Sequence, residues 1–582
     1  MTWNRPERDE RTLGDWTIER RDDELADLQW RGHRVLRSIR AVVRDSDWNT
    51  LPLTVGEISG HGTGIEIAVR TTEPAFEGVL RATADAAKLA ITLDLRAMRD
   101  VDTNRTGVVV LHPPQVAGAP LQVGHSDGTT EQTAFPERIS AHQPVFDITS
   151  LGWTHDGARA DLAFDGDVFE MEDQRNWTDA SFKTYNRPLS LPFPYRVIEG
   201  EHVVQALRIE VQETADAEIR AASDTIRLTP AGPFPSVGVA AASAPDPAPV
   251  VDPVGTTLLV ELDLASRDWR AAIARASTSG LPLDVRFVID PAAPEKIPDA
   301  VAALAGIDLV RATAFHQVSD ARHVSDGEAI DLLRAALAAH GRTPAVIGGS
   351  RSHFTELNRE LHRLPDDLDG IAVTVTPLFH SADTEQIVES VAMQRLVAEE
   401  TVARAAGRPV HIGPVSLRPR FNDVAASPQP LSPHDDLRDG YGPEFTGTDD
   451  DRQQAPELAA WTIASAAALA VPGVASLVWF EEWGPRGIRS SDGEDFPVAS
   501  ALHALAALAA RDGATLLTGP SPDGLLWAIG ARTDAGDDIL VANIADEPRS
   551  LHISTDRGEA AVALAPSTFT RISLPRTEES HA

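Results

Sequence analysis

The stretch IAVTVTPLFHSADTEQIVESVAMQRLVAEETVARAAGRPVHIGPVSL, residues 371–417, carries the pattern that decides the fold. It begins with an apolar, β-branched run, continues with a long segment of helix-forming residues, and ends with a second apolar run. Apolar strands that alternate with helices are typical of a parallel sheet covered by helices. The stretch therefore predicts one strand–helix–strand unit of an α/β domain.

Similar units lie on both sides of this stretch. The predicted buried strands are 258–264, 283–290, 309–315, 344–349, 371–377, 409–417 and 474–482. Seven such units fit a (β/α)8 TIM barrel, and we expect a weak eighth strand near GPRGIRS, residues 484–490. A doubly wound open sheet is the alternative, but no G-x-G-x-x-G motif follows the first strand, which disfavours a dinucleotide-binding sheet.

The regions before and after these units consist of short alternating strands and turns. We expect an N-terminal β-sandwich-like domain over residues 1–250, which ends in a linker rich in Pro, Ala and Gly at 229–255. The catalytic barrel is expected over 251–512, and a small antiparallel β domain over 513–582. The sequence thus predicts a multidomain protein with a central barrel.

The composition narrows the classes of function. The chain has 52 Lys and Arg against 87 Asp and Glu, a net charge of −35, so we expect no binding to nucleic acid or to a membrane surface. Because cysteine is absent, disulfides, thiolate nucleophiles and Cys-ligated metals are excluded. The charged N-terminus and the lack of a long apolar run predict a cytoplasmic protein. The sequence leaves open whether the chain forms a homo-oligomer.

In a TIM barrel, reactive side chains lie at the carboxyl ends of the strands and in the loops that follow them. This rule selects a set of candidate substrate-binding residues in the barrel: His316, Arg351, His353, Asn358, His380, Asp383, Arg418, Arg420, Asn422 and Trp483. The candidate catalytic residues are the carboxylates Glu356, Glu481 and Glu482.

These carboxylates follow the strands that we count as the fourth and the seventh, which face each other across a barrel. Clan-A glycoside hydrolases place their acid/base and their nucleophile on these two strands. Of two carboxylates near one substrate, one can act as the acid/base and the other as the nucleophile. Only one of Glu481 and Glu482 can face the axis, and the pattern does not show which. Because G-x-S-x-G, H-E-x-x-H and P-loop motifs are missing, we expect a hydrolase without a metal or cofactor.

A second notable stretch, FEMEDQRNWTDASFKTYNRPLSLPFP at residues 169–194, lies in the N-terminal region. Its many charged, amide and hydroxyl groups need partners if they are buried. It could wall the active site or join two domains. We expect it to reach the barrel mouth, and its candidate site residues are Asp173, Arg175, Asn176, Trp177 and Lys183.

Several segments resemble the bacterial D-apionate lactonase family: GDVFEMEDQRNWTDASFKTYNRPLSLPFPY, NRTGVVVLHP, FPERISAHQPVFDI, FTELNR, FHSAD, PVHIGPVSLRPRFN and FEEWGPRG. The resemblance covers most of residues 100–490. It implies an N-terminal β domain, a central barrel and a C-terminal β domain, similar to clan-A glycoside hydrolases. It also implies that the chain opens D-apionolactone to D-apionate in apiose catabolism, with no cofactor.

Three hypotheses follow. In the first, a carboxylate activates water and Arg or His polarises the carbonyl of a sugar lactone. In the second, the chain is a retaining glycoside hydrolase with Glu356 as acid/base and Glu481 or Glu482 as nucleophile, about 5–5.5 Å apart. The third is a sugar-binding protein without activity, which the many ionisable residues at strand ends disfavour.

Overall fold

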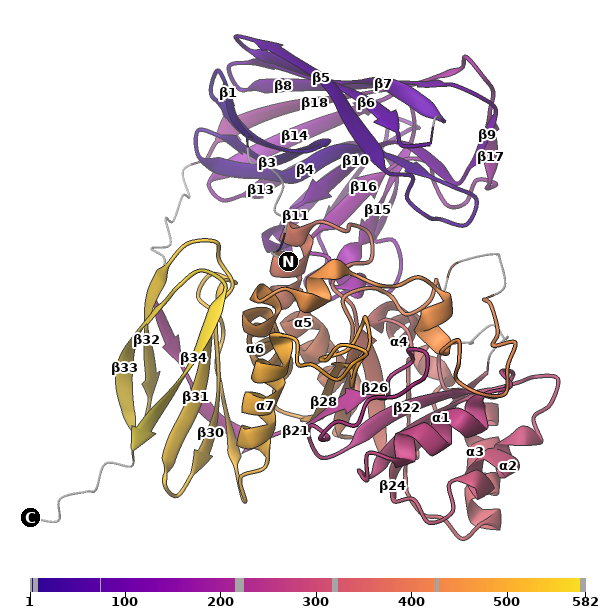
Figure 1. Cartoon of the computed structure of the whole chain (residues 1–582). Coiled ribbons are helices and arrows are strands. Elements are labelled where there is room, and N and C mark those ends of the chain that lie inside the picture. The colour runs from indigo at the N-terminus through magenta and orange to yellow at the C-terminus, as the bar shows by residue number, and fades with distance from the viewer. Residues whose placement is uncertain are drawn as a thin grey trace, which may run out of the picture.

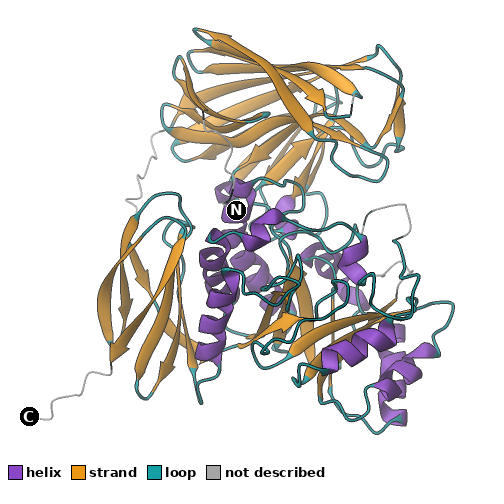
Figure 2. Ribbon diagram, viewed as in Figure 1, coloured by secondary structure: helices purple, strands orange, loops and turns teal. Residues whose placement is uncertain are grey.

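A computed structural model describes Trp3 and residues 9–73, 75–214, 224–316, 323–422, 424 and 429–575. Figure 1 shows an N-terminal β domain above a central barrel, with a smaller β domain at the side of the barrel. The α-helices gather in the central domain (Figure 2). This confirms the predicted three-part architecture. No helix in the described part of the chain is long and apolar enough to cross a membrane.

The N-terminal domain is built on one antiparallel sheet of 16 strands that runs in the order β1-β2-β3-β4-β10-β16-β15-β13-β14-β18-β8-β7-β6-β5, with β11 and β12 attached through β13. A large apolar core, to which strands from both halves of this order contribute, holds the domain together. The elements are β1 (Asp9–Leu13), β2 (Trp16–Arg21), β3 (Glu24–Trp30), β4 (His33–Arg44), β5 (Leu53–His61), β6 (Gly64–Thr71), β7 (Phe76–Asp85), β8 (Lys88–Ala97), β9 (Val101–Thr103), β10 (Arg105–His112), η1 (Pro114–Val116), β11 (Pro120–His125), β12 (Thr130–Ala134), β13 (Val145–His155), β14 (Ala158–Asp165), β15 (Phe169–Asp173), η2 (Gln174–Trp177), β16 (Phe182–Tyr185), β17 (Tyr195–Val197) and β18 (His202–Glu213).

One face of strands β4, β10, β16 and β15 carries charged side chains. Arg44 lies opposite Arg105, and Lys183 lies opposite Glu172. Side chains alternate between the two faces of a strand, so the register places these four residues and Tyr185 on the same face. We call this set the charged sheet face. Strands β15 and β16 reach down to the barrel in Figure 1.

The barrel closes with eight parallel strands: β21 (Ser236–Ala240), β22 (Leu258–Asp263), β23 (Leu283–Ile289), β24 (Leu309–His316), β25 (Ala345–Gly349), β26 (Gly370–Val375), β27 (Val410–Val415) and β28 (Val474–Glu481). The first strand, β21, lies inside the segment that we predicted as a linker, and β21 pairs with both β22 and β28. The prediction of a last strand near residues 484–490 is therefore wrong, and each strand number that we assigned is too low by one.

The barrel is surrounded by α1 (Trp269–Ser277), α2 (Lys296–Ala303), α3 (Gly327–Ala339), α4 (Phe354–Glu360), α5 (Thr384–Arg404), α6 (Glu457–Leu469) and α7 (Val498–Ala509), with short turns η3 (Leu361–Arg363), η4 (Gly442–Phe445) and η5 (Asp451–Gln454). Helix α6 is buried along its whole length after Glu457. It packs between the barrel and the C-terminal sheet, which explains why its sequence is apolar on every side.

The C-terminal domain has two sheets, ordered β19-β32-β33 and β20-β29-β30-β31-β34. Its strands are β19 (Thr225–Arg227), β20 (Thr229–Pro233), β29 (Thr515–Thr518), β30 (Leu526–Thr533), β31 (Gly536–Asn543), β32 (Arg549–Thr555), β33 (Gly558–Leu564) and β34 (Thr568–Pro575). Two of these strands precede the barrel in the chain. The domain is therefore discontinuous in sequence, unlike the 513–582 unit that we expected.

The segment at residues 169–186 is buried almost throughout. Arg175, only 2 % exposed, donates from Nη2 to Asp173 at 2.7 Å and to the carbonyl of Pro136 at 2.9 Å. Asp173 also accepts from the backbone N–H of Ser140 at 2.9 Å. This buried pair fixes the turn that leads from β15 into η2.

We predict that Arg175→Leu lowers the free energy of unfolding of the N-terminal domain by about 3–5 kcal/mol, because it leaves the Asp173 carboxylate buried without its cation. Urea unfolding followed by tryptophan fluorescence measures this change. The control is Arg208→Leu, which removes an exposed pair with Asp165 and should cost less than about 1 kcal/mol. Equal effects of the two substitutions would contradict the prediction.

Candidate active site

At the carboxyl ends of the barrel strands, the loop that follows β26 contacts the N-terminal domain through Thr376 and His380. Because β21 is the first strand, Glu356 follows the fifth strand, β25, and Glu481 ends the eighth, β28. The expectation that these residues belong to strands four and seven is wrong. The fourth and seventh strands are β24 and β27, which end at His316 and Val415.

Near the barrel axis lies a group that we call the axis cluster: Glu261, Arg286, Arg351 and Arg420. Glu261 on β22 accepts from Arg351 at 2.5 Å and from Arg420 at 3.2 Å. Burial alone would raise the pKa of Glu261, but these two cations outweigh it and hold the pKa far below its usual range. Arg286 on β23 donates to the carbonyl of Gly413 across the barrel at 2.5 Å. Arg351 and Arg420 thus both contact Glu261, and the substrate-binding role expected for them stays a prediction.

At the end of β28, the register resolves which carboxylate faces the axis. Glu481 pairs with Ala240, whose side chain joins a small apolar cluster inside the barrel, so Glu481 is the residue on the axis side. It accepts from the backbone N–H of Ser243 at 2.9 Å and from Arg486 at 3.3 Å. For Glu482, burial raises the pKa to about 7, although Arg489 and Arg275 act against this shift.

Glu356 has the contacts of a helix-capping residue. Its Oε2 accepts from the backbone N–H of His353 at 2.9 Å and from the hydroxyl of Ser352 at 3.0 Å, which makes Glu356 the third residue of a capping box on α4. The ring of His353 lies 4.7 Å from the ring of Phe379, edge to face. The catalytic role that we expected for Glu356 rested on its strand number, which the structure corrects, and the capping contacts favour a structural role instead.

The segment around η2 docks onto the loops that follow β25 and β26. The hydroxyl of Thr178 donates to the carbonyl of Thr376 at 2.5 Å, and the ring of Trp177 stacks on Phe379 at 5.7 Å. Asn358 donates to the side-chain oxygen of Asn176 at 3.0 Å. The segment therefore reaches the mouth of the barrel and also joins the two domains.

At the centre of this contact, Nδ1 of His380 lies 2.7 Å from Oδ2 of Asp179. The Asp179 side chain is 4 % exposed and the His380 side chain 16 %. Burial raises the pKa of Asp179 to about 8, with Lys183 acting against it. Burial, followed by repulsion from Lys183, Arg44 and Arg105, lowers the pKa of His380 well below its usual value.

The charged sheet face supplies cations to the same place. Lys183 forms an ion pair with Glu172, while burial lowers the pKa of Lys183 to about 8. Arg105 is 6 % exposed, and its guanidinium lies 3.7 Å from the ring of Tyr185. Within the described ranges, no hydrogen bond or ion pair involves this guanidinium. Burial and the neighbouring Arg105 lower the pKa of Arg44 to about 10, so Arg44 stays charged at neutral pH.

The remaining predicted site residues are spread around the barrel mouth. His316 lies 3.4 Å from Asp326, and Arg418 pairs with Asp450 at 2.8 Å. Three others have the following contacts: Asp383 lies 3.4 Å from Arg40, Asn422 donates to the carbonyl of Asp47 at 3.2 Å, and Trp483 is buried beside Arg275. Asp173 and Arg175 do not reach the barrel as we expected, because their hydrogen bonds within the described ranges stay inside the N-terminal domain.

The sequence-based prediction missed Glu261, Arg286, Asp179, Arg44 and Arg105. A charged residue inside an apolar strand, such as the glutamate in LLVELD at 258–263, indicates a side chain that faces the barrel axis. Our prediction did not use this signal. The charged sheet face depends on strand pairing between β4, β10 and β16, which local pattern does not reveal. No group of three metal-ligating side chains occurs among the residues that the structure describes.

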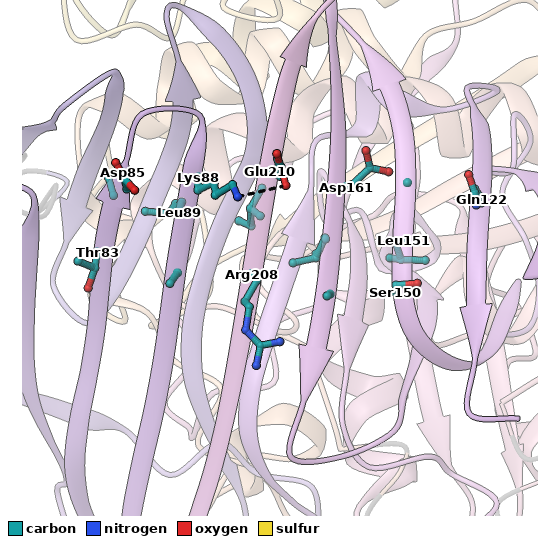
Figure 3. A pocket seen from close by; sticks show the side chains of 16 residues that line it. Thr83, Asp85, Lys88, Leu89, Gln122, Ser150, Leu151, Asp161, Arg208 and Glu210 are labelled. Atoms are coloured by element: carbon teal, nitrogen blue, oxygen red, sulfur yellow. Dashed lines mark ion pairs between the residues drawn. The ribbon is translucent and has the colours of Figure 1, made fainter. Parts of the chain in front are cut away.

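A groove of about 530 Å³ also crosses strands β7, β8, β18, β14, β13 and β11 of the N-terminal sheet. Figure 3 shows Lys88 and Glu210 paired in it, near Asp161 and Arg208. None of the predicted site residues lines this groove.

Comparison with known proteins matches two parts of the chain to domains of the same protein family. Residues 1–214 match the model of the D-apionate lactonase N-terminal domain, and residues 236–510 match that of the D-apionate lactonase TIM barrel domain. The chain is 26 % identical over 596 aligned positions to D-apionate lactonase of Brucella anthropi, covering 92 % of this chain and 93 % of that protein.

Solved structures with a detectable likeness include a GH30 endoxylanase from Clostridium papyrosolvens C71, with TM-score 0.38 and 11 % identity over 60 % of this chain and 99 % of that chain. A β-arabinopyranosidase has TM-score 0.33 and 10 % identity over 95 % of this chain and 98 % of that chain. The two domain matches together span most of the sequence, including the barrel and its mouth. The chain belongs to the D-apionate lactonase family.

Proposed function

We propose that this protein opens a sugar lactone, with D-apionolactone as substrate and D-apionate as product, in the catabolism of apiose. The proposal includes the cytoplasmic location and the absence of a cofactor expected from the sequence. Its partner is a small sugar lactone, not nucleic acid or membrane. Family membership and the name of the curated relative support the substrate.

The observation that carries the proposal is the buried guanidinium of Arg105, which has no carboxylate partner in the described part of the chain and lies beside Arg44 and Lys183. Water attack on a lactone produces an anionic tetrahedral intermediate and then a carboxylate. Fixed cations in a poorly hydrated site stabilise both species. A chain of net charge −35 that keeps such cations together where two of its domains meet is suited to bind an anion there.

The same cations argue against the glycosidase alternative. Glycoside hydrolysis passes through an oxocarbenium-like, positively charged transition state, which nearby guanidinium groups destabilise. The corrected strand count also removes the positional argument for Glu356 and Glu481 as its carboxylate pair. Lactone hydrolysis is therefore the function that the site supports best.

We predict that Arg105→Met lowers kcat/KM for D-apionolactone by about 10- to 150-fold, since a hydrogen bond to a charged group contributes about 1.5–3 kcal/mol. A coupled assay of acid release, corrected for spontaneous hydrolysis, measures the change. The matched control is Arg81→Met, an exposed arginine paired with Glu66, which should leave the rate unchanged. Aryl furanosides and pyranosides are assayed in parallel, and turnover of these without lactone turnover would refute the proposed function.

We predict that Glu356→Gln changes kcat by less than about tenfold, because a glutamine can make the same capping-box contacts as the glutamate. An acid–base role would instead give a loss of at least about 10²-fold. Steady-state kinetics with purified protein distinguish the two roles. A large loss with unchanged thermal stability would return Glu356 to the catalytic set.

A further inference from the structure

We infer that His380 is the general base of the reaction, that Asp179 positions it, and that Arg105 with Arg44 and Lys183 binds the lactone carbonyl and the carboxylate that forms from it. This inference rests on the proposed function and adds the catalytic groups. The site is shared between domains, because His380 follows β26 of the barrel while the other four residues come from the N-terminal domain.

The geometry around His380 is that of an oriented base. When Asp179 is ionised, Nδ1–H donates to Oδ2 over 2.7 Å, which leaves the lone pair of Nε2 to act on water. No bond to Nε2 occurs within the described ranges. The ring is held between Trp177, 5.2 Å away edge to face, and Phe379, 4.8 Å away. The His380 side chain is 16 % exposed, so part of it is accessible to solvent.

Charged groups face this pair from every element packed against it. His380 lies within the field of Lys183 on β16, Arg44 on β4, Arg105 on β10 and His353 before α4. Asp179 lies within the field of Lys183, Arg37, Glu172 and His353. Arg37 is already engaged, because it donates to Glu389 on α5 at 2.7 Å. Arg105 and Arg44 are the cations in this set for which the structure gives no carboxylate contact in the part it describes.

In the inferred reaction, His380 acts first as a base and then as an acid. Water attacks the lactone carbonyl carbon while its proton moves to Nε2 of His380, and the carbonyl oxygen becomes an oxyanion beside the guanidinium groups. The oxyanion then reforms the carbonyl as the ring C–O bond breaks. The leaving alkoxide takes the proton from His380 and becomes a hydroxyl group. The acid group that remains ionises, and the carboxylate rests against the same cations.

The wild-type pH profile follows from the pair. Burial raises the pKa of Asp179 to about 8. Below that pH the Asp179–His380 pair binds one more proton, and Nε2 of His380 then no longer has a free lone pair. The rate should therefore rise as the pH increases from 6 to 9. In Asp179→Asn, the imidazolium loses its carboxylate, so the pKa of His380 falls and the rising limb moves to lower pH, with a lower plateau. A purely structural role of Asp179 would not move the limb.

The test compares wild type with His380→Gln, Asp179→Asn and the control His202→Gln, which alters an exposed histidine held by Asp94 at 2.6 Å. We expect His380→Gln to lower kcat by about 10²- to 10⁴-fold, with D-apionate binding retained in calorimetry, and His202→Gln to behave as wild type. Retained D-apionate binding also shows that a slow variant is folded.

The outcomes separate the two proposals. A wild-type protein that does not hydrolyse D-apionolactone overturns the proposed function. A wild-type protein that does so, together with near-normal kcat in His380→Gln, overturns only the assignment of the base. If His380→Gln does not fold, the pH profile of Asp179→Asn decides, and an unshifted limb refutes the inference.

Discussion

The structure depends on how charges are neutralised between the N-terminal sheet and the barrel. Arg37 forms an ion pair with Glu389, Arg40 forms one with Asp383, and His380 lies within hydrogen-bond distance of Asp179, each across the domain boundary. Buried ions left without partners would each cost several kcal/mol. The two domains therefore fix each other's orientation through contacts that neither could make alone. The barrel mouth is shaped by the sheet as much as by its own loops.

This constraint explains the varied composition of residues 169–194. Part of the segment stabilises the N-terminal domain through the buried ion pair between Arg175 and Asp173. Another part meets the barrel through Trp177 and Thr178. Because nearly every side chain from Phe169 to Asn186 is buried in a different environment, no simple periodicity survives. Its charges and amides are there because each has a specific partner.

The sequence predicted the barrel, the three-part organisation and the loops at its mouth, because continuous apolar strands and helical periodicity are local properties. It did not predict β21, which has only five residues and lies between prolines. A Cβ at Gly238 in this strand would come within 2.6 Å of the carbonyl of Thr257, so close strand contact requires the glycine that made the segment look like a linker. That one short strand shifted every strand number and with it the carboxylate assignment.

The residues that local pattern missed share one property: their role exists only after distant strands are paired. Arg44 and Arg105 are 61 positions apart in sequence but opposite each other in the sheet. Two like charges so placed repel, and burial increases the repulsion, so their close placement is electrostatically unfavourable. In the proposed reaction, an anion bound between them removes this cost, so the developing oxyanion is bound more strongly than the neutral lactone. Such differential stabilisation is the requirement for catalysis.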